Sequence, residues 1–283
     1  MIATPKVKVN DIQIYYEVKG EGFPLVMIQG LSYSLDGWDL RLIEGLSKMF
    51  KLVLFDNRGA GRTGVSDREY TMKLFADDTA GLMNALGIYK AHILGLSMGG
   101  MIAQELVLNY PEKVAKLVLC STGSQWCFSQ EASRILSAMT ELSQEELTRM
   151  ILSLKFASDF PSDFVRKKPG VVILFTSDFV KEHPDLVDLL ILQAAKHPIS
   201  KEGWIRQLNA IRGFNTHGRL QKIKVPTLIL HGRKDVEIPP ENGSILAEAI
   251  PNAKLVYLEK SAHSLAEEMR EVISLITDFL AQP

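Results

Sequence analysis

The stretch AHILGLSMGGMIAQELVLNY, residues 91–110, is the part of the sequence that decides the fold. It begins with a short apolar run, passes through the turn Gly95-Leu-Ser97-Met-Gly99, and continues as a pattern typical of a helix. A buried strand, a sharp turn and a helix in this order are typical of a serine held at the carboxyl end of a parallel strand. Because the predicted helix starts directly after Ser97, the unpaired N–H groups of its first turn would face whatever reacts at this serine.

Short apolar runs alternate with helical patterns on both sides of this stretch. Each run is too short for a helix, and most end at Gly, Asp or Ser, as buried parallel strands do. The predicted strands are Leu25–Ile28, Leu52–Phe55, His92–Leu94, Leu117–Leu119, Thr227–Leu230 and Leu255–Leu258. The helical patterns include Met72–Leu86, Met101–Asn109, Asn242–Ala249 and Leu265–Leu280. Residues 5–10 and 12–20 alternate apolar and polar side chains, which predicts an N-terminal antiparallel hairpin. The whole pattern predicts an α/β fold with a mostly parallel central sheet and helices on both faces.

The alternation of strands and helices is interrupted once, between Thr122 and Val225. This stretch contains helical patterns such as Ser129–Ser153 and Pro184–Lys196, and the apolar run Val171–Phe175 lies among them. Ligands bind at the carboxyl ends of the strands in open α/β sheets. An insertion that leaves from such a strand end would therefore cover the binding site.

The position of this interruption predicts the domain organisation. We expect a core domain of residues 1–124 and 216–283, and an inserted helical cap of residues 125–215. The aromatic side chains of the predicted cap are candidates for lining the cleft or for packing the interior of the cap. They are Trp126, Phe128, Phe156, Phe160, Phe164, Phe175, Phe179 and Trp204.

The composition excludes several classes of partner. The chain has 283 residues, of which 46% are hydrophobic and 23% charged, and its formal net charge is -1. This balance gives no electrostatic reason to bind nucleic acid or an anionic membrane.

Cys120 and Cys127 are the only cysteines, and they form no motif of a thiolate metal site. We see no signal peptide and no apolar run near the ~18 residues that a membrane span needs, so we expect a cytoplasmic location. The sequence leaves the oligomeric state open.

A serine nucleophile needs a general base, and the base needs an acid that orients it. In the strand–turn–helix setting of Ser97, the expected order along the chain is serine, acid, histidine. Asp235 and His263 follow in this order, each in the loop after a predicted strand. We therefore take Ser97, Asp235 and His263 as the candidate catalytic residues. Glu237 is a nearby alternative for the acid, because spacing alone does not separate it from Asp235.

Acyl transfer also needs an oxyanion hole. One donor would be the backbone N–H of Met98, directly after the candidate nucleophile. The second would come from the loop after the strand at 25–28, where Gly30 allows a tight turn and the N–H of Leu31 is the natural candidate. Such donors stabilise charge that develops in the transition state, by about 3–4 kcal/mol each. The chemistry implies no metal and no organic cofactor.

Together these residues resemble the α/β-hydrolase superfamily over nearly the whole chain. The segment Phe55–Thr63, FDNRGAGRT, also resembles the D-x-R-G-x-G-x-S turn of that superfamily. Within it, the chain is most similar to capped hydrolases described as 3-oxoadipate enol-lactonase-like or as carboxylesterases. The resemblance implies an α/β-hydrolase fold with an inserted cap and an esterase or lactonase acting on a small ester or lactone. The site residues that it implies are Ser97, Asp235, His263, Leu31 and Met98.

One residue departs from the pattern of this superfamily. Gln29 precedes Gly30 where many members have histidine, which puts the geometry of this loop in question. Ser97 argues against the dehalogenases and epoxide hydrolases of the superfamily, which use a carboxylate nucleophile. Other enzymes with the same triad remain alternatives: carbon–carbon bond hydrolases, perhydrolases and acyltransferases. A small-molecule receptor with slow turnover is a further alternative.

Overall fold

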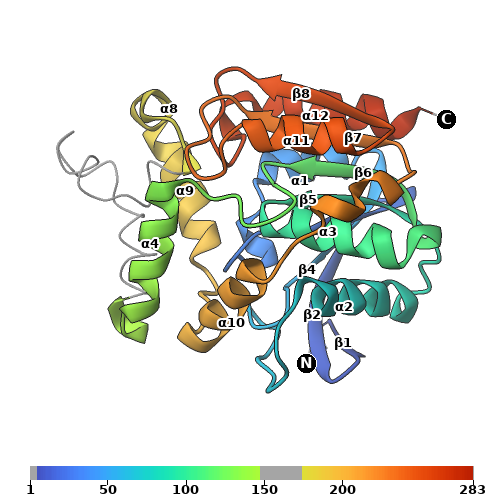
Figure 1. Cartoon of the computed structure of the whole chain (residues 1–283), viewed down its shortest axis with the longest axis horizontal. Helices are drawn as coiled ribbons and strands as arrows, with labels where there is room; N and C mark the ends of the chain where they lie inside the picture. Colours follow the sequence, from blue (N-terminus) through green and yellow to red (C-terminus); the bar gives the residue numbers. More distant parts are fainter. Residues whose placement is uncertain (1–4, 147–173, 283) are drawn as a thin grey trace.

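Within residues 5–146 and 174–282, which the computed structural model describes, eight strands form one sheet in the order β1-β2-β4-β3-β5-β6-β7-β8 (Figure 1). The strands are β1 (Lys6–Val9), β2 (Ile12–Lys19), β3 (Phe23–Ile28), β4 (Phe50–Phe55), β5 (Ala91–Leu96), β6 (Val114–Cys120), β7 (Thr227–Gly232) and β8 (Ala253–Leu258). β2 pairs antiparallel with β1 and β4, and all other neighbouring pairs are parallel. The predicted N-terminal hairpin and mostly parallel α/β sheet are therefore confirmed.

Both faces of the sheet are covered, which explains why its central strands are apolar throughout. In β3, Val26 and Ile28 join the cluster of apolar side chains on one face of the sheet, and Leu25 and Met27 join the cluster on the other. All four side chains are fully buried. Successive side chains of a strand point to opposite faces. A strand with two covered faces therefore has a continuous apolar run instead of an alternating pattern.

The helices form a layer on each face of the sheet. On one face lie α1 (Leu40–Leu46) and α12 (Met269–Ala281), and on the other lie α2 (Met72–Ala85), α3 (Met98–Asn109) and α11 (Glu241–Ala249). The described ranges also contain short 3-10 turns, namely η1 (Leu35–Gly37), η2 (Pro111–Lys113), η4 (His217–Lys222) and η5 (Ala266–Glu268). The helix predicted from Leu265 starts only at Met269, because Leu265 has a φ of 60° and the turn η5 follows it. Across the two described ranges, no helix combines the length and apolar character that crossing a bilayer requires.

The strands extend beyond the predicted apolar runs, and β6 shows why. Lys116 interrupts its apolar pattern, so the prediction began only at Leu117. The side chain of Lys116 is largely buried, and its Nζ donates to the carbonyl oxygen of Phe279, 3.0 Å away, near the end of α12. A cation that pairs with the carbonyl end of a helix is stabilised there. This partner lies too far along the chain for a local pattern to reveal it.

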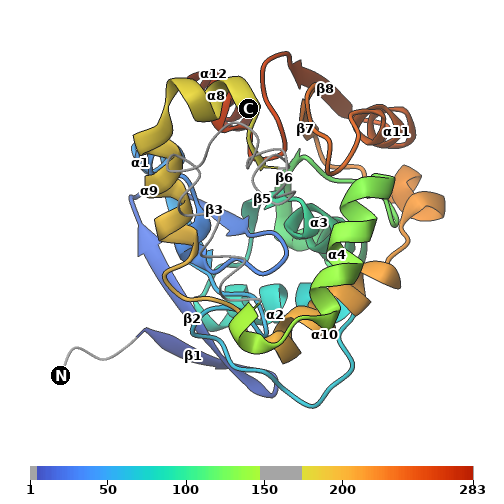
Figure 2. The ribbon, with the colours of Figure 1, turned by 90° about the vertical axis from the view of Figure 1, so that its left-hand side faces the viewer.

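The helices α4 (Gln130–Glu141), α8 (Ser177–Glu182), α9 (Pro184–Ala194) and α10 (Lys201–Arg212) lie together on one side of the molecule, to the left in Figure 1. Figure 2 looks onto this side and shows α8 and α9 to the left and α4 and α10 to the right, in front of the strands. The two ends of this region meet in an antiparallel bridge between Gln125 and Asn215. The N–H of Thr216 also donates to the carbonyl oxygen of Ser124 at 2.8 Å. The chain thus leaves the core and returns to it at the same place.

One segment predicted to be helical in this region is interrupted. The pattern Ser129–Ser153 predicts helical structure, but α4 ends at Glu141 and Leu142 is extended, with ψ of 146°. Ser143 then caps a new helical segment: its Oγ accepts from the N–H of Glu146 at 3.2 Å, and the Glu146 carboxylate accepts from the N–H of Ser143 at 2.8 Å. This reciprocal capping box is written in the sequence as Ser-x-x-Glu. The remainder of that range, the apolar run at 171–173, and Phe156, Phe160 and Phe164 lie outside the described residues.

Candidate active site

Ser97 occupies a strained turn between the end of β5 and the start of α3. Its φ of 55° and ψ of -120° lie in a region that costs a residue with a side chain roughly 1–3 kcal/mol. Two hydrogen bonds hold the turn in place. The N–H of Ser97 donates to the carbonyl oxygen of Cys120 at 2.9 Å, and its own carbonyl oxygen accepts from the hydroxyl of Thr122 at 2.8 Å. The turn is therefore fixed from β6, the neighbouring strand.

Close approaches of the backbone explain the small residues around Ser97. A Cβ added to Gly95 would collide with the carbonyl oxygen of Gly99, and a Cβ added to Gly99 would collide with that of Ile28 in β3. A Cβ added to Gly30 would lie 3.8 Å from the Oγ of Ser97. The loop after β3 therefore lies directly against the serine, as predicted for a loop that supplies an oxyanion donor.

Asp235 and His263 form a buried pair across the loops after β7 and β8. The Nδ1 of His263 lies 2.8 Å from the Oδ2 of Asp235. The other carboxylate oxygen of Asp235 accepts from the N–H groups of Glu237 and Ile238, both at 2.9 Å. His231, at the end of β7, lies 3.4 Å from Asp235 through its Nε2. The carboxylate is thus held by its own loop, and the contact with Nδ1 directs the Nε2 of His263 away from Asp235.

Electrostatics favour an ionic pair between these two residues. Burial by itself would lower the pKa of His263, but the charges of Asp235 and Glu237 raise the pKa to about 9. Burial by itself would raise the pKa of Asp235, but His263 and His231 lower that pKa to about 2. Each group therefore favours the charged form of the other.

Glu237 approaches the same imidazole from its other nitrogen. Its Oε2 lies 3.7 Å from the Nε2 of His263, on the side of the ring opposite the contact with Asp235. Burial raises the pKa of the Glu237 carboxyl, and the positive charge of His263 opposes that change. The sequence left open which carboxylate orients the histidine. The geometry has Asp235, and not Glu237, at Nδ1.

One cavity brings together most of the predicted site residues. Ser97, His263, Leu31 and Glu237 all line it. The segment just before α8 and the helix α9 contribute part of its wall, through Leu174, Phe175, Leu190, Ile191 and Ala194. Another part lies between α1 and α12, lined by Leu42, Met269, Val272 and Ile276. The cavity is therefore mostly apolar around a few polar groups, as small-molecule sites usually are.

The two predicted oxyanion donors occupy different surroundings. Leu31 lines the cavity, and its N–H has no hydrogen-bond partner in the part of the chain that the structure describes. Met98 is the first residue of α3, and its side chain is fully buried. An N–H group in the first turn of a helix has no partner within that helix. Both N–H groups are thus available to donate a hydrogen bond to a ligand oxygen placed near Ser97.

Three side chains that the sequence analysis did not identify hold the loop after β3. The Nδ2 of Asn57 donates to the carbonyl oxygen of Gln29 at 2.9 Å, and Asp56 accepts from the N–H of Leu35 at 2.7 Å. Gln207 of α10 accepts from the N–H of Ser32 at 2.9 Å. The Gln29 side chain itself accepts from the N–H of Gly30 at 2.8 Å, so glutamine still braces the position that many family members fill with histidine. Asp56 and Asn57 belong to the turn quoted from the sequence, whereas nothing near Gln207 in the sequence indicates its contact.

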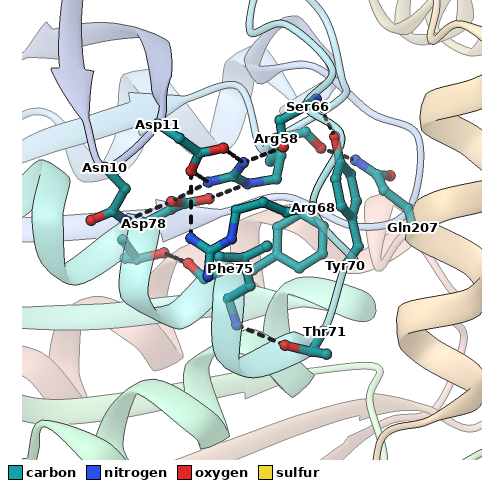
Figure 3. Close-up of polar contacts among 12 residues, drawn as sticks. Asn10, Asp11, Arg58, Ser66, Arg68, Tyr70, Thr71, Phe75, Asp78 and Gln207 are labelled. Atoms are coloured by element: carbon teal, nitrogen blue, oxygen red, sulfur yellow. Dashed lines mark hydrogen bonds and ion pairs between the residues drawn. The ribbon is translucent and has the colours of Figure 1, made fainter.

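Arg58, in the same turn, anchors this side of the molecule (Figure 3). Its guanidinium is fully buried and makes two bonds of 2.8 Å to Asp78 in α2 and two of 2.9 Å to Asp11 in the hairpin. The Nε2 of Gln207 donates to the carbonyl oxygen of Arg58 at 2.9 Å. Paired forks of this kind fix both distance and orientation. The turn after β4 is therefore joined to α2, to the N-terminal hairpin and to α10.

Of the five candidate cap aromatics that the structure describes, only Phe175 lines the cavity. Phe179 stacks on Phe175, with ring centroids 6.0 Å apart. Trp126 and Phe128 contact each other, and Trp204 is buried in the main apolar cluster. Most of these aromatic side chains therefore pack the protein interior.

Comparisons with known proteins find relatives over nearly the whole chain. The sequence profile of the α/β hydrolase fold family matches residues 24–268. A relative from Azorhizobium caulinodans, named as the carbamate hydrolase RutD, is 26% identical over 265 residues, which cover 94% of this chain and 93% of that protein. The 2-hydroxymuconate semialdehyde hydrolase of a Pseudomonas species is 26% identical over 275 residues, which cover 93% of this chain and 88% of that protein.

A solved structure extends the similarity to three dimensions. The enol-lactonase from Burkholderia xenovorans superposes with a TM-score of 0.82 at 26% identity, covering 98% of this chain and 100% of that one. The family match spans most of the chain, and the eight-stranded sheet has the helices that this fold requires on both faces. This chain therefore belongs to the α/β-hydrolase superfamily.

Proposed function

We propose that this protein is a serine hydrolase that cleaves a small carboxylic ester or lactone through an acyl-enzyme on Ser97. The observation that carries the proposal is the joint placement of Ser97 and His263 on one cavity, with the Nδ1 of His263 held by Asp235 at 2.8 Å. A nucleophile on a strained turn, next to a base that is oriented by a buried acid, is the arrangement that acyl transfer requires.

In the proposed reaction, the Oγ of Ser97 attacks the substrate carbonyl carbon while the Nε2 of His263 takes the hydroxyl proton. Asp235 keeps the proton of His263 on Nδ1 and stabilises the imidazolium that forms. The negative oxygen of the tetrahedral intermediate accepts hydrogen bonds from the N–H groups of Leu31 and Met98. Collapse of the intermediate breaks the bond to the leaving oxygen, which receives its proton from His263.

The second half of the reaction repeats these steps with water. Water attacks the acyl carbon of the ester on Ser97 while His263 takes a proton from it. The intermediate collapses, the bond to the Oγ of Ser97 breaks, and His263 returns the proton to the serine. The carboxylic acid then leaves, and the enzyme is restored without a metal or an organic cofactor.

We further propose that residues 125–215 act as a cap that shapes the cleft without contributing to the triad. The bridge between Gln125 and Asn215, where the region leaves and rejoins the core, supports these boundaries. Leu174, Phe175, Leu190, Ile191 and Ala194 of this region line the cavity beside Ser97. Substitution of Phe175 by alanine should therefore change the preference among acyl chain lengths by at most roughly 10–200-fold.

Carbon–carbon bond hydrolysis is the second candidate function. It is favoured by the similarity to the 2-hydroxymuconate semialdehyde hydrolase over 93% of this chain. We place it second because no lysine or arginine lines the described part of the cavity wall, so this wall offers no cation to stabilise an enolate or carbanion leaving group. An ester or lactone leaves as an alkoxide that takes its proton from His263 and needs no such cation.

A turnover screen tests the proposed function. Steady-state kcat/KM is measured for p-nitrophenyl esters of increasing chain length, for lactones, for carbamates and for vinylogous diketones. We expect the highest values for an ester or a lactone, and a loss of turnover on the order of 10⁴–10⁶ in Ser97→Ala. Faster cleavage of a vinylogous diketone would favour the second candidate. Wild-type rates in a folded Ser97→Ala variant would overturn both.

A further inference from the structure

Glu237 is an unusual group in the wall of the cavity. Its side chain is only 15% exposed, and its Oε2 lies within ion-pair distance of the Nε2 of His263, at 3.7 Å. Asp39 is the other acidic residue of the described lining, but it caps α1 and forms a bidentate pair with Arg41. Once His263 is neutral, Glu237 is therefore the carboxylate of the described wall whose negative charge can attract a ligand.

The described remainder of the wall offers no counter-charge for an anion. It contains no lysine and no arginine, and most of its side chains are aliphatic. In apolar surroundings a fixed charge acts more strongly than in water, because the effective dielectric constant is lower. A carboxylate in such a wall repels an anionic substrate and attracts a cationic one.

Aromatic side chains line the same cavity. Tyr33, Trp38 and Phe175 are part of its wall. Tyr33 and Glu237 both line this cavity, and burial together with the charge of Glu237 raises the pKa of the Tyr33 hydroxyl. Aromatic rings beside an anion suit an alkylated ammonium group, which is attracted by both the ring faces and the charge.

The position of Glu237 also indicates which half of a substrate it meets. In the proposed reaction, the Nε2 of His263 protonates the leaving oxygen, so the alcohol half of an ester lies next to that nitrogen. Glu237 is 3.7 Å from the same nitrogen. A cation a few bonds beyond the ester oxygen would therefore come within ion-pair distance of the carboxylate.

We propose that Glu237 forms an anionic subsite for the leaving group, so that the enzyme prefers esters of ammonium-bearing alcohols and discriminates against esters of alcohols that carry a carboxylate. This inference rests on the proposed function of Ser97 and His263, and it names the substrate class of that site. Glu237 acts here as a specificity-determining residue, whereas Asp235 orients the base.

Three acetate esters of similar size test the inference. Their alcohols are 2-(trimethylammonio)ethanol, its uncharged isostere 3,3-dimethylbutanol, and 3-hydroxypropanoate. We expect kcat/KM of the wild type to fall in that order, with a preference for the cationic ester over its isostere of roughly 10- to 100-fold above neutral pH. In Glu237→Gln the preference should fall towards one, and cleavage of the anionic ester should improve relative to the neutral ester.

Glu241→Gln is the matched control. It is the same substitution four positions further along, at an exposed residue that does not line the cavity. It should keep the wild-type ratio of cationic to neutral ester. A wild-type ratio near one would overturn the inference, and so would a ratio that Glu237→Gln leaves unchanged.

Binding separates this inference from the proposed function. Calorimetric titration of the Ser97→Ala variant with the cationic and neutral esters measures recognition without turnover. Tighter binding of the cationic ester, lost in the Ser97→Ala, Glu237→Gln double variant, supports the subsite even if no ester is hydrolysed. Hydrolysis of the neutral ester by the wild type, without any preference in binding or turnover, would contradict the subsite and leave the proposed function standing.

Discussion

The side-chain oxygen of Gln207 accepts a hydrogen bond from the backbone N–H of Ser32 at 2.9 Å, across 175 positions of the sequence. Gln207 is fully buried in α10, and its amide nitrogen donates to the carbonyl oxygen of Arg58. Ser32 directly follows Leu31 and has a φ of 72°, which a residue with a side chain adopts only when its surroundings hold it. A helix of the proposed cap thus fixes the loop that presents the proposed oxyanion donor.

Replacement of Gln207 should therefore impair catalysis more than binding. Gln207→Leu leaves the N–H of Ser32 and the carbonyl oxygen of Arg58 without partners, which costs about 1–3 kcal/mol and loosens the loop. We expect kcat to fall by roughly 10- to 100-fold with a smaller change in KM, because the donor from Leu31 is needed mainly in the transition state. Asn209→Ala, at an exposed position of the same helix, is the control. A change of KM as large as the change of kcat in Gln207→Leu would argue against a positioning role of Gln207. So would a loss of kcat in Asn209→Ala equal to that in Gln207→Leu.

The two carboxylates beside His263 should differ sharply on substitution. Asp235→Asn removes the acceptor at Nδ1 and favours the wrong tautomer of the imidazole, so kcat should fall by about 10⁴. Glu237→Gln leaves the contact at Nδ1 in place, and kcat for an uncharged ester should stay close to that of the wild type at pH values above the raised pKa of His263, which is about 9. Steady-state kinetics on an uncharged ester compares the two variants. The reverse order of losses would move the orienting acid to Glu237.

The dependence of activity on pH should reflect the charges around His263. The pKa of this residue is raised because Asp235 and Glu237 favour the imidazolium, and only the neutral imidazole can act as the base. The acid limb of kcat/KM should therefore lie above the ordinary histidine value of about 6.5, with activity lost as the pH falls.

Glu237→Gln provides the test of this explanation. Removal of one anion lowers the pKa of His263, so the acid limb should move to lower pH and activity at neutral pH should rise for an uncharged ester. The measurement is a kcat/KM profile against pH for both proteins. An acid limb that does not move, or that moves to higher pH, would show that Glu237 does not act on the base.

Removal of the Arg58 guanidinium should destabilise the fold. Arg58→Met leaves Asp78 buried in α2 without its cation, and breaking a buried pair in this way costs about 3–5 kcal/mol. Arg134→Met is the control, because Arg134 and its partner Glu131 are both more than half exposed, and such pairs contribute about 0–1 kcal/mol. Urea denaturation gives the free energy of unfolding for each variant. Equal losses in both would mean that the Arg58 cluster in Figure 3 does not anchor the hairpin and α2.

Features of the fold that depend on neighbours in the sequence could be predicted from it. The strand, the Gly-x-Ser-x-Gly turn and the helix around Ser97 are local, and the turn needs small residues for steric reasons that act within a few positions. The strands buried on both faces could be predicted from their continuous apolar runs, because such a run is also a property of neighbouring residues. The capping box at Ser143 is also local and was present in the sequence, although the helical periodicity around it obscured it.

Features that depend on distant partners could not be predicted. Lys116 looked like the end of a strand, because the carbonyl groups that it meets lie at the other end of the chain. The sequence placed Asp235 and Glu237 in one loop, but their distances to the two nitrogens of His263 depend on how the loops after β7 and β8 meet. The role of Gln207 could not be predicted from the sequence, since only the packing of α10 brings it to Ser32.

Covalent labelling tests the central claim most directly. The folded protein is treated with a small uncharged fluorophosphonate, digested, and mapped by mass spectrometry, with Ser97→Ala and Asp235→Asn treated in parallel. We expect one phosphonylated residue, Ser97, no label in Ser97→Ala, and much slower labelling in Asp235→Asn, because the base is then poorly oriented. A label on another residue, or a folded wild-type protein that stays unlabelled, would contradict the proposal that Ser97 is the nucleophile.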